Sequence, residues 1–567
     1  MTLNRIFLAL VLFFLFSSFL LPGSVSDQAA AAPENGGMGI PADREPGKKA
    51  LKKPDARQVL KFAVHVSSAD NLDPHFAAGS QDRALADMVF NGLFRYKPGR
   101  APQIEPDLAA GMPRFEIIDS KQVWTVALRQ GVMFHSAPGI PAHELTAADV
   151  VFSLEKSADK NHSAYSGDYS GMSFRQKERY TVEIVLDQPI SGALFFPKFS
   201  DYAGGFIVSR QAVQAMGYEK FNKHPVGTGP FVFQQHMPGK KIILRAHDTY
   251  FRGAPLLKGV ELFFAPGIQE REQGLKSGKF HVIMGSGQEG WIEKIEQTPD
   301  IRLDFHGAGE VVTIHLNTDM PPLDDPRVRR AIAWALSRKT FLDTSHHRLV
   351  EKVCSPVPAG LLPGGLTEKE ARAATDLTYT KNREKARALL REAGYPDGFV
   401  LDLVSSEKRL YLSCYRSMCD QFGPIGIRCR IQVKPHAAMH REIRQAPKPI
   451  VIYVAWRPNA DRYLSRFFHS NAVVVSGAVP DTNFSHYTEV DRLIEDARLA
   501  VSPQRQIDLW QHAQIRILND MAAYPVMVTK QCYARRVGVD YGHELVATMA
   551  LYPQFTEKTR IVTEGNF

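Results

Sequence analysis

The chain is poor in cysteine, with five among 567 residues. They are Cys354, Cys414, Cys419, Cys429 and Cys532. So few cysteines exclude a small disulfide-scaffolded domain and, in an oxidising compartment, allow at most two internal disulfides with one thiol left over. Cys414 and Cys419 are five apart in a helix-like segment and fall on different faces, so we do not expect them to pair. Most of the five should be buried small apolar residues.

The sequence also lacks a block of charge of one sign. Its net charge of +9 comes from 69 basic residues scattered among 60 acidic ones, which argues against a nucleic-acid partner. The densest basic cluster is Arg327, Arg329, Arg330, Arg338 and Lys339. We predict that this cluster is the solvent-exposed face of one helix, with two of its charges at the C-terminal end where the helix dipole favours cations.

Motifs for catalysis, cofactors and metals are scarce. The chain has no P-loop and no G-x-S-x-G elbow, which leaves a hydrolase without support, although a nucleophile and its base can lie far apart in sequence. GSGQEG at 285–290 fits G-x-G-x-x-G between a strand-like and a helix-like stretch, but no clean βαβ unit continues from it. His436 and His440 would share a helix face, yet no glutamate or third ligand accompanies them, so we expect packed or surface histidines. We predict no metal, cofactor or catalytic residue.

The amino terminus has the pattern of an export signal. Arg5 precedes an apolar run from Ile6 to Leu21, and small residues follow up to Ala32. The run is about 16 residues long, shorter than the roughly 20 needed to cross a bilayer, so cleavage is favoured over an uncleaved anchor. No cysteine offers a lipoprotein acceptor there. We therefore predict a signal peptide at 1–32, a flexible leader at 33–56 and a free periplasmic protein, with no other membrane-spanning stretch.

The rest of the chain predicts a mixed α/β protein. Its length suggests roughly three or four structural units. Apolar spacing predicts helices over 81–94, 325–339, 382–394, 490–501 and 506–521, and a hairpin over 231–247. Thr146, Asp325 and Asn382 are the expected helix caps. No repeat of fixed period and no regular alternation of strand and helix is present.

Several blocks, in order, resemble the family 5 extracellular solute-binding proteins, which include oligopeptide-, dipeptide-, nickel- and haem-binding periplasmic proteins. The blocks are LDPHFAAGS at 72–80, FNGLFRY at 90–96, HPVGTGPFVF at 224–233, HDTYFRGAPLLKGVEL at 247–262, IHLNTDMPPLDDPRVRRAIAWALSR at 314–338, ARALLREAGYPDGFVLDL at 386–403, and VDRLIEDAR at 490–498 with YPV at 524–526. Their order and spacing carry the resemblance, which covers nearly all of 57–560.

The resemblance implies a periplasmic-binding-protein-like clamp of the large type II, cluster C-like form. One main lobe would combine 57–92, 208–310 and 522–567; an accessory lobe would occupy 93–207; and the second main lobe would span 311–521. The ligand would lie between the main lobes, and a ligand drives their closure only by binding the closed form better than the open one. Membrane permease subunits of an ABC importer would then recognise the closed clamp.

The resemblance also implies a ligand site. In peptide-binding members a strand ending in Gly-Trp-x-Ala-Asp supplies the aspartate that pairs with the peptide ammonium group, whereas here Ala455-Trp456-Arg457-Pro458 leads to Asn459. If the strand stays extended, Arg457, Asn459 and Asp461 share one face and Trp456 takes the other. Either Asp461 replaces the missing charge, or Arg457 and Asn459 favour an anionic or acceptor group, or Arg457 and Asp461 neutralise each other.

His75 and Phe76, just after the first turn, are further candidates for the cleft, with a packed core role as the alternative for Phe76. The leading functional hypothesis is a monomeric receptor for a peptide or peptide-like solute that serves an ABC importer and is not an enzyme. Its alternatives are a receptor for a sugar, haem or a chelated metal such as nickel, a sensory or chaperone-like binding protein without an importer, and an exported hydrolase.

Overall fold

The computed structural model describes residues 58–562 except for residues 70, 78 and 550. The predicted signal peptide (1–32) and leader (33–56) lie outside the described residues. Helices and strands are intermixed along the described chain, which confirms the mixed α/β prediction. Among the helices of this part, none has both the length and the apolar character needed to cross a bilayer.

The largest sheet in the described chain has nine strands in the order β16-β12-β17-β11-β1-β10-β9-β8, with β13 paired to β17. The strands are β1 (Val59–Val64), β8 (Phe231–Met237), β9 (Lys241–Ala246), β10 (Gly259–Phe264), β11 (Val282–Met284), β12 (Ile301–Leu316), β13 (Val350–Lys352), β16 (Ile450–Ala455) and β17 (Ala523–Arg536). β1 runs parallel to both β10 and β11. Leu60, Phe62 and Ala63 are fully buried, so both faces of β1 are covered, as expected for a central parallel strand. The predicted hairpin is confirmed as β8 and β9.

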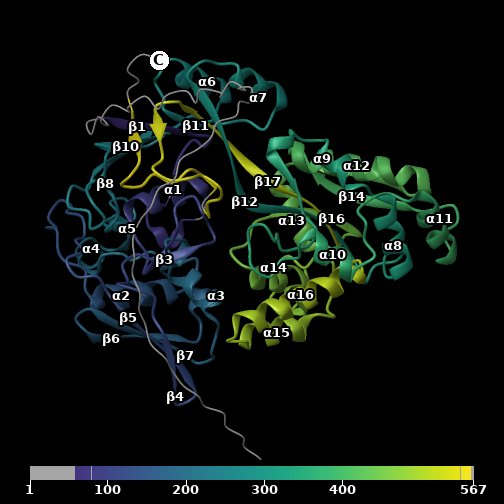
Figure 1. Ribbon diagram of the computed structural model, residues 1–567, viewed down its shortest axis with the longest axis horizontal. Helices are drawn as coiled ribbons and strands as arrows, with labels where there is room; N and C mark the ends of the chain where they lie inside the picture. The colour runs from purple at the N-terminus through teal and green to yellow at the C-terminus, as the bar shows by residue number, and fades with distance from the viewer. Residues whose placement is uncertain (1–57, 70, 78, 550, 563–567) are drawn as a thin grey trace, which may run out of the picture. The chain divides into compact units, whose positions relative to one another are not determined.

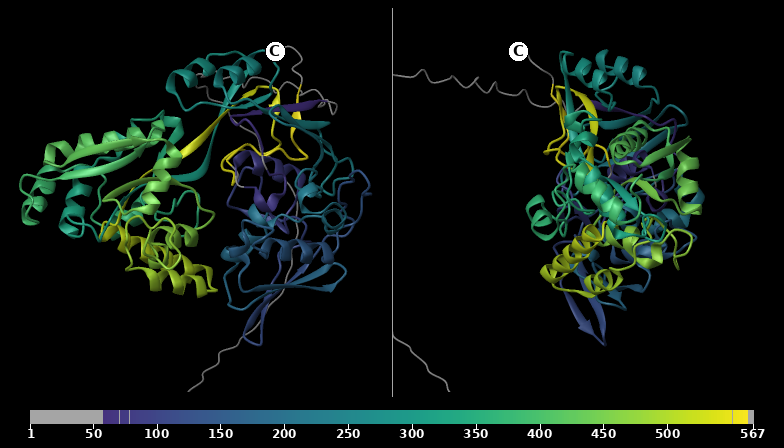
Figure 2. Two further views of the ribbon diagram at one scale, coloured as in Figure 1. Left: turned by 180° about the vertical axis from the view of Figure 1, so that it is seen from behind. Right: turned by 90° about the vertical axis from the view of Figure 1, so that its right-hand side faces the viewer.

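The two longest strands, β12 and β17, lie next to each other in this sheet. β12 has 16 residues and β17 has 14, and they pair antiparallel from Ile301 opposite Arg536 to His315 opposite Ala523. The register shifts between Gly307 and Glu310, where the ladder is irregular. β12 also pairs with β16, and β17 with β11, so the two strands connect β16, at one edge of the sheet, to β11 and β1 in its middle (Figures 1 and 2).

A separate four-stranded antiparallel sheet lies inside the segment predicted as the accessory lobe. Its order is β4-β5-β7-β6. The strands are β4 (Phe115–Ile118), β5 (Lys121–Ala127), β6 (Met172–Glu178) and β7 (Thr181–Leu186). α2 (Ala147–Ala158) begins after Thr146, whose backbone N–H donates to the Asp149 carboxylate at 3.0 Å, so the predicted cap position is confirmed. The boundaries of the three lobes stay predictions.

The remaining elements are short, and most begin at polar caps. The helices are α1 (Ser80–Val89), α3 (Gly192–Phe195), α4 (Arg210–Met216), α5 (Tyr218–Phe221), α6 (Ile268–Lys276), α7 (Glu289–Glu296), α8 (Pro326–Ala335), α9 (Arg338–Leu342), α10 (Glu368–Ala374), α11 (Arg383–Glu392), α12 (Arg409–Phe422), α13 (His436–Gln445), α14 (Ala460–Phe468), α15 (Asp491–Leu499) and α16 (Pro503–Asn519). The 3₁₀ turns are η1 (Pro74–Phe76), η2 (Ser166–Tyr169), η3 (Phe196–Phe199), η4 (Ala203–Gly205), η5 (His347–Leu349), η6 (Gly423–Ile425) and η7 (Ser470–Ala472). Three small sheets pair β2 (Phe94–Tyr96) with β3 (Ile104–Pro106), β14 (Val400–Ser406) with β15 (Arg428–Lys434), and β18 (Val539–Asp540) with β19 (Arg560–Ile561).

Most predicted helices start within one residue of the expected position and end earlier, whereas α16 begins at Pro503 and not at 506. Asp325 accepts from the Arg327 N–H at 2.7 Å, and Asn382 accepts from the Lys385 N–H at 3.0 Å, which confirms both caps. The helix predicted over 325–339 breaks after Ala335 and resumes as α9. The helix predicted over 81–94 ends at Val89, and its last residue belongs to β2.

The basic cluster of α8 and α9 is not a solvent-exposed face of one helix, so that prediction is wrong. Arg327, Arg330 and Lys339 are exposed, whereas Arg329 and Arg338 are buried. The Arg329 guanidinium donates to the backbone oxygens of Leu323 at 2.7 Å and Asp520 at 2.9 Å. The Arg338 guanidinium lies 3.5 Å from the centre of the Tyr379 ring. Backbone carbonyls and a ring face replace water around these two cations.

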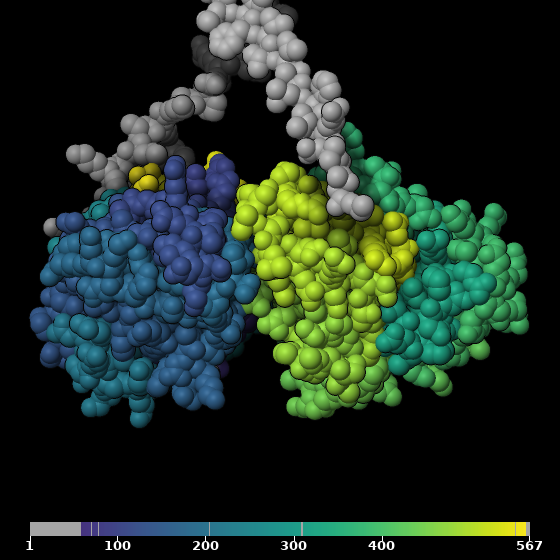
Figure 3. Space-filling model, turned by 90° about the horizontal axis from the view of Figure 1, so that it is seen from below, coloured from purple at the N-terminus to yellow at the C-terminus, as the bar shows by residue number. Residues whose placement is uncertain are grey.

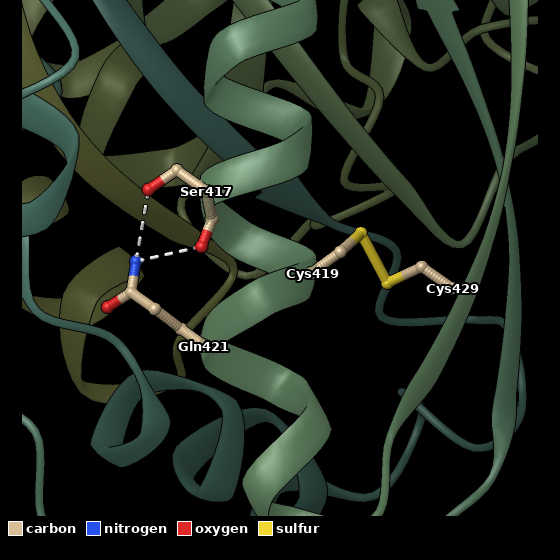
Figure 4. Close-up of a disulfide and its surroundings, with 4 residues drawn as sticks. All are labelled: Ser417, Cys419, Gln421 and Cys429. Atoms are coloured by element: carbon tan, nitrogen blue, oxygen red, sulfur yellow. Dashed lines mark hydrogen bonds between the residues drawn. A yellow bond between two sulfur atoms is a disulfide. The ribbon is translucent and has the colours of Figure 1, made fainter.

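One disulfide joins α12 to β15 (Figure 4). Cys419 pairs with Cys429 across a Cα–Cα distance of 5.8 Å. Cys414, one and a half turns before Cys419, faces the core as a free thiol, which confirms that it does not pair with Cys419. Cys354 and Cys532 are likewise free and buried, as predicted for most of the cysteines.

An ion pair is buried beneath η1. The Lys156 ammonium lies 2.8 Å from the Asp73 carboxylate, with side chains 1% and 2% exposed. The same ammonium lies 3.0 Å from Nδ1 of His75 and donates to the His162 carbonyl at 3.1 Å. Burial lowers the pKa of Lys156, and the Asp73 carboxylate opposes that shift. The pair therefore fastens the first turn of the chain to α2.

Replacing Lys156 by Met should reduce the free energy of unfolding by about 3–5 kcal/mol, because it leaves the Asp73 carboxylate buried without a cation. Urea unfolding measures this loss. Lys160→Met is the matched control, since Lys160 is exposed two residues past the end of α2, and it should change stability by less than about 0.5 kcal/mol. Equal losses in the two variants would contradict the account.

Four buried histidines make the fold sensitive to acid. Burial lowers the pKa of His75, His135, His306 and His315 to about 3. Neither ring nitrogen of His306 has a hydrogen-bond partner among the described residues. Because each folded-state pKa lies below the ordinary value of 6.5, the unfolded chain binds more protons, and stability falls as pH drops from about 6.5 towards 3.

The variant His306→Phe should flatten this pH dependence. Each buried histidine contributes about 1.4 kcal/mol of lost stability between pH 7.5 and 5.5, and the phenyl ring removes that contribution while keeping the contact with Tyr533. Urea unfolding of both proteins at the two pH values measures the difference. Identical losses in wild type and variant would show that His306 titrates normally in the folded protein.

Candidate ligand-binding cleft

A cleft of about 920 Å³ opens between segments that are far apart in sequence. Most residues of its lining come from two segments, 164–204 and 453–498. The first segment also touches α16 beside the cleft: the Ser191 hydroxyl donates to Oε1 of Gln506 at 2.7 Å, and both side chains are fully buried. Figure 3 shows the blue surface of the first segment meeting the yellow-green surface of the second.

The segment after β16 places four predicted residues in the lining: Trp456, Arg457, Asn459 and Asp461. β16 ends at Ala455 and α14 begins at Ala460. Oδ1 of Asn459 accepts from the Arg462 N–H at 2.9 Å and so caps α14. The prediction of one shared face along an extended strand is therefore wrong, because the chain turns into a helix within this segment.

Arg457 and Asp461 do not pair with each other, although such a pair was one of the three alternatives. Asp461 pairs with Arg498 at 2.7 Å, and its side chain is only 11% exposed. The Arg457 guanidinium donates to the Trp456 carbonyl at 2.9 Å and lies 4.8 Å from the centre of the Phe467 ring. Arg457 thus has no carboxylate partner among the described residues, whereas the charge of Asp461 is already matched.

His75 and Phe76 do not belong to the lining of this cleft. His75 is fully buried, and its Nε2 lies 2.9 Å from the Phe206 carbonyl and 3.0 Å from the Ser157 hydroxyl. Its own carbonyl accepts from the Ala164 N–H at 3.0 Å, and Ala164 does line the cleft. The Phe76 ring faces the Lys156 ammonium at 5.7 Å. His75 therefore supports the wall of the cleft from behind.

An aromatic chain crosses the lining. The Arg83 guanidinium of α1 lies 4.9 Å from the centre of the Tyr202 ring. The Tyr202 ring meets the Trp456 ring edge to face, with centroids 5.5 Å apart. Nε of Arg83 is buried and has no hydrogen-bond partner among the described residues. A cation–aromatic and an aromatic pair thus link three distant segments around the space a ligand would fill.

Most charges of the lining are matched in pairs. Asp168 pairs with Arg462, Asp481 with Arg466, and Asp187 with Lys121. Three cations of the lining lack a carboxylate partner in the described chain: Arg83 faces the Tyr202 ring, and Arg457 and Lys198 donate to backbone carbonyls. Burial lowers the pKa of Lys198 to about 8, against the opposing effect of Asp461. The lining therefore carries unmatched positive charge suited to an anionic ligand group.

Sequence reasoning missed Arg83, Lys198, Tyr202 and Glu310. They come from α1, η3, the start of η4 and β12, and no spacing rule connects them. Only the packing of these elements brings them to one cleft. The signal that did work was the resemblance at 455–459, which marked a single stretch of the lining.

Two other motifs have the predicted local structure. GSGQEG at 285–290 follows β11 and runs into the first turn of α7. His436 and His440 share one face of α13, with their Nε2 atoms 3.2 Å apart. His436 also contacts the Ser406 hydroxyl at 3.0 Å, and His440 contacts Arg444. Within residues 58–562, no group of three or more metal-binding side chains is assembled.

Comparison with known proteins gives one consistent family. The model of the bacterial extracellular solute-binding proteins, family 5, matches residues 103–473. A probable di/tripeptide-binding protein 5 of Pseudomonas aeruginosa is 28% identical over 508 residues, which is 84% of this chain and 90% of the relative. Heme-binding protein A of Haemophilus influenzae is 25% identical over 79% of this chain and 83% of its own length.

Solved structures of periplasmic binding proteins are also similar to this chain. The binding protein MoaA of A. tumefaciens R10, in complex with mannopinic acid, is similar with a TM-score of 0.72 and 32% identity, over 89% of this chain and all of that one (100%). DppA of Helicobacter pylori, in complex with the peptide STSA, has a TM-score of 0.70 and 23% identity, covering 90% and 99%. The second likeness bears on the fold alone.

The ion pair of Arg462 with Asp168 should couple the two segments that border the cleft. Its side chains are 27% and 34% exposed, so we expect a coupling of only about 0.5–1 kcal/mol in a double-mutant cycle of Arg462→Met and Asp168→Asn. Urea unfolding in low salt measures it, and the coupling should shrink in 1 M NaCl. Additive losses at low salt would contradict the contact.

Proposed function

Because the chain belongs to the family 5 bacterial extracellular solute-binding proteins, we propose that it captures a peptide or peptide-like solute for an ABC importer. The observation that carries this proposal is the cleft of about 920 Å³, a volume within the range of small-molecule sites. Trp456, Arg457, Asn459 and Asp461 are the proposed ligand-binding residues of its lining. Binding proteins for short peptides among the relatives support the same reading.

We infer that capture proceeds by closure of the clamp. β12 and β17 belong to the sheet that holds both β1 and β16, and the segments that border the cleft already touch through Arg462 with Asp168. A ligand that contacts both segments at once stabilises the closed arrangement and not the open one. Closure would bury the ligand and present one composite surface to the membrane permease.

Location, assembly and chemistry follow from the family as proposals. The signal-like segment at 1–32 supports export and cleavage, and periplasmic binding proteins among the relatives support a periplasmic location. We propose a monomer that docks on permease subunits. We also propose that it performs no catalysis, since its relatives are substrate-binding proteins.

A second candidate is a receptor for an acidic non-peptide solute. Asn459 stands where peptide-binding members have the amine-pairing aspartate, and the unmatched cations Arg83, Arg457 and Lys198 line the same cleft. The similar protein MoaA was solved with mannopinic acid. Such a solute would use the positive lining without requiring a carboxylate at position 459.

Replacing Asn459 by Asp tests the choice between these ligands. The aspartate can cap α14 as Asn459 does, so the fold should tolerate it, and its charge should tighten binding of the dipeptide Ala-Phe by about tenfold. Isothermal titration with Ala-Phe and N-acetyl-Ala-Phe measures the gain, which should be confined to the free amine. Asn459→Ser keeps a capping oxygen without the charge and should show no gain. No change in the aspartate variant would contradict a role of this position in selectivity.

A further inference from the structure

Glu310 enters the cleft from the irregular part of the long strand pair. It lies on β12 immediately after the register shift that follows Gly307, opposite Thr529 of β17. Its side chain is partly buried and belongs to the lining together with Tyr453 and Arg457. The carboxylate therefore stands at the strand pair that joins the two bordering segments, where a ligand in the cleft can reach it.

The partners of Glu310 set it apart from the other acids of the lining. Asp168, Asp187, Asp461 and Asp481 each pair with an arginine or a lysine. Oε2 of Glu310 instead accepts from the neutral Gln531 amide at 3.1 Å. Among the described residues, Glu310 is thus the one lining carboxylate without a cation beside it.

The surroundings make this carboxylate costly to keep unpaired. Burial raises the pKa of Glu310 above its usual value, and the hydrogen bonds from Thr529 and Gln531 oppose this only in part. Burial raises the pKa of the Tyr411 and Tyr463 phenols, and the Glu310 charge adds to that rise. In so poorly hydrated a place, a carboxylate gains most from a cation that arrives with its own hydrogen-bond donors.

We propose that Glu310 is the anchor for a protonated amine of the bound solute. The solute is then zwitterionic: its amine meets Glu310, and its acidic group meets the unmatched cations of the same cleft, Arg83 and Arg457. This inference rests on the proposed function and deepens it, because it supplies at position 310 the amine-pairing carboxylate that position 459 lacks. It requires no further charge at Asn459 and leaves the Asp461–Arg498 pair intact.

The source of the amine is either a peptide amino terminus or the nitrogen of an amino-acid conjugate. Ala-Phe represents the first source and mannopinic acid the second, while N-acetyl-Ala-Phe is the same peptide without a basic nitrogen. The three probes can be compared by isothermal titration on the full mature chain. Binding of Ala-Phe alone would assign the peptide source, and binding of mannopinic acid alone would assign the conjugate.

The variant Glu310→Gln tests the anchor. We expect this variant to weaken binding of the amine-bearing probe by about 30-fold or more, because it removes the carboxylate partner of a desolvated ammonium. Where Ala-Phe is the ligand, the variant should also bind Ala-Phe and N-acetyl-Ala-Phe equally. Glu351→Gln is the matched control: Glu351 is exposed on β13 and pairs with Lys530, so its loss should leave the affinity unchanged.

A second readout uses the unaltered protein, so that it does not depend on folding of the variant. Protonation of Glu310 removes its charge, so affinity for the amine-bearing probe should fall as pH is lowered from 7.5 to 5, and Glu310→Gln should lose this dependence. A variant that keeps both full affinity for the amine and the pH profile would overturn the anchor while leaving the receptor function intact. If the wild type binds none of the three probes, that result would instead overturn the proposed function, and this inference with it.

Discussion

The antiparallel pairing of β12 with β17 is the constraint on which the rest of the structure depends. It runs from Ile301 opposite Arg536 to His315 opposite Ala523 and belongs to one sheet with both β1 and β16. β16, which leads directly into the lining residues Trp456 and Arg457, is held in the sheet by its pairing with β12. The irregular register near Gly307 matters for the same reason, because it turns Glu310 into the space between the two bordering segments.

Charge matching explains how the cleft can be both stable and receptive. Lining carboxylates at 168, 461 and 481 are held by arginines, which limits the cost of their partial burial. The groups left without a partner are then the ones a ligand can satisfy. The buried Lys156–Asp73 pair lies outside the lining of the cleft, so a ligand that satisfies the unmatched charges leaves that pair intact.

Local signals in the sequence predicted local structure well. The caps at Asp325 and Asn382 and the hairpin of β8 and β9 depend on neighbours within a few residues, and the structure has them. The burial of Arg329 and Arg338 could not be predicted, because their partners Asp520 and Tyr379 lie far along the chain. The site divides in the same way: the resemblance marked 455–461, whereas Arg83, Tyr202 and Glu310 meet it only through tertiary packing.

The central claim is that this cleft captures a small solute bearing both an acidic and a basic group. Native mass spectrometry of the protein purified from the periplasm, followed by gentle denaturation to release and identify the bound molecule, tests it most directly. The account predicts a solute small enough for about 920 Å³ that carries a protonatable nitrogen and a carboxylate. A neutral sugar, a haem or a bare metal ion as the bound species would contradict it.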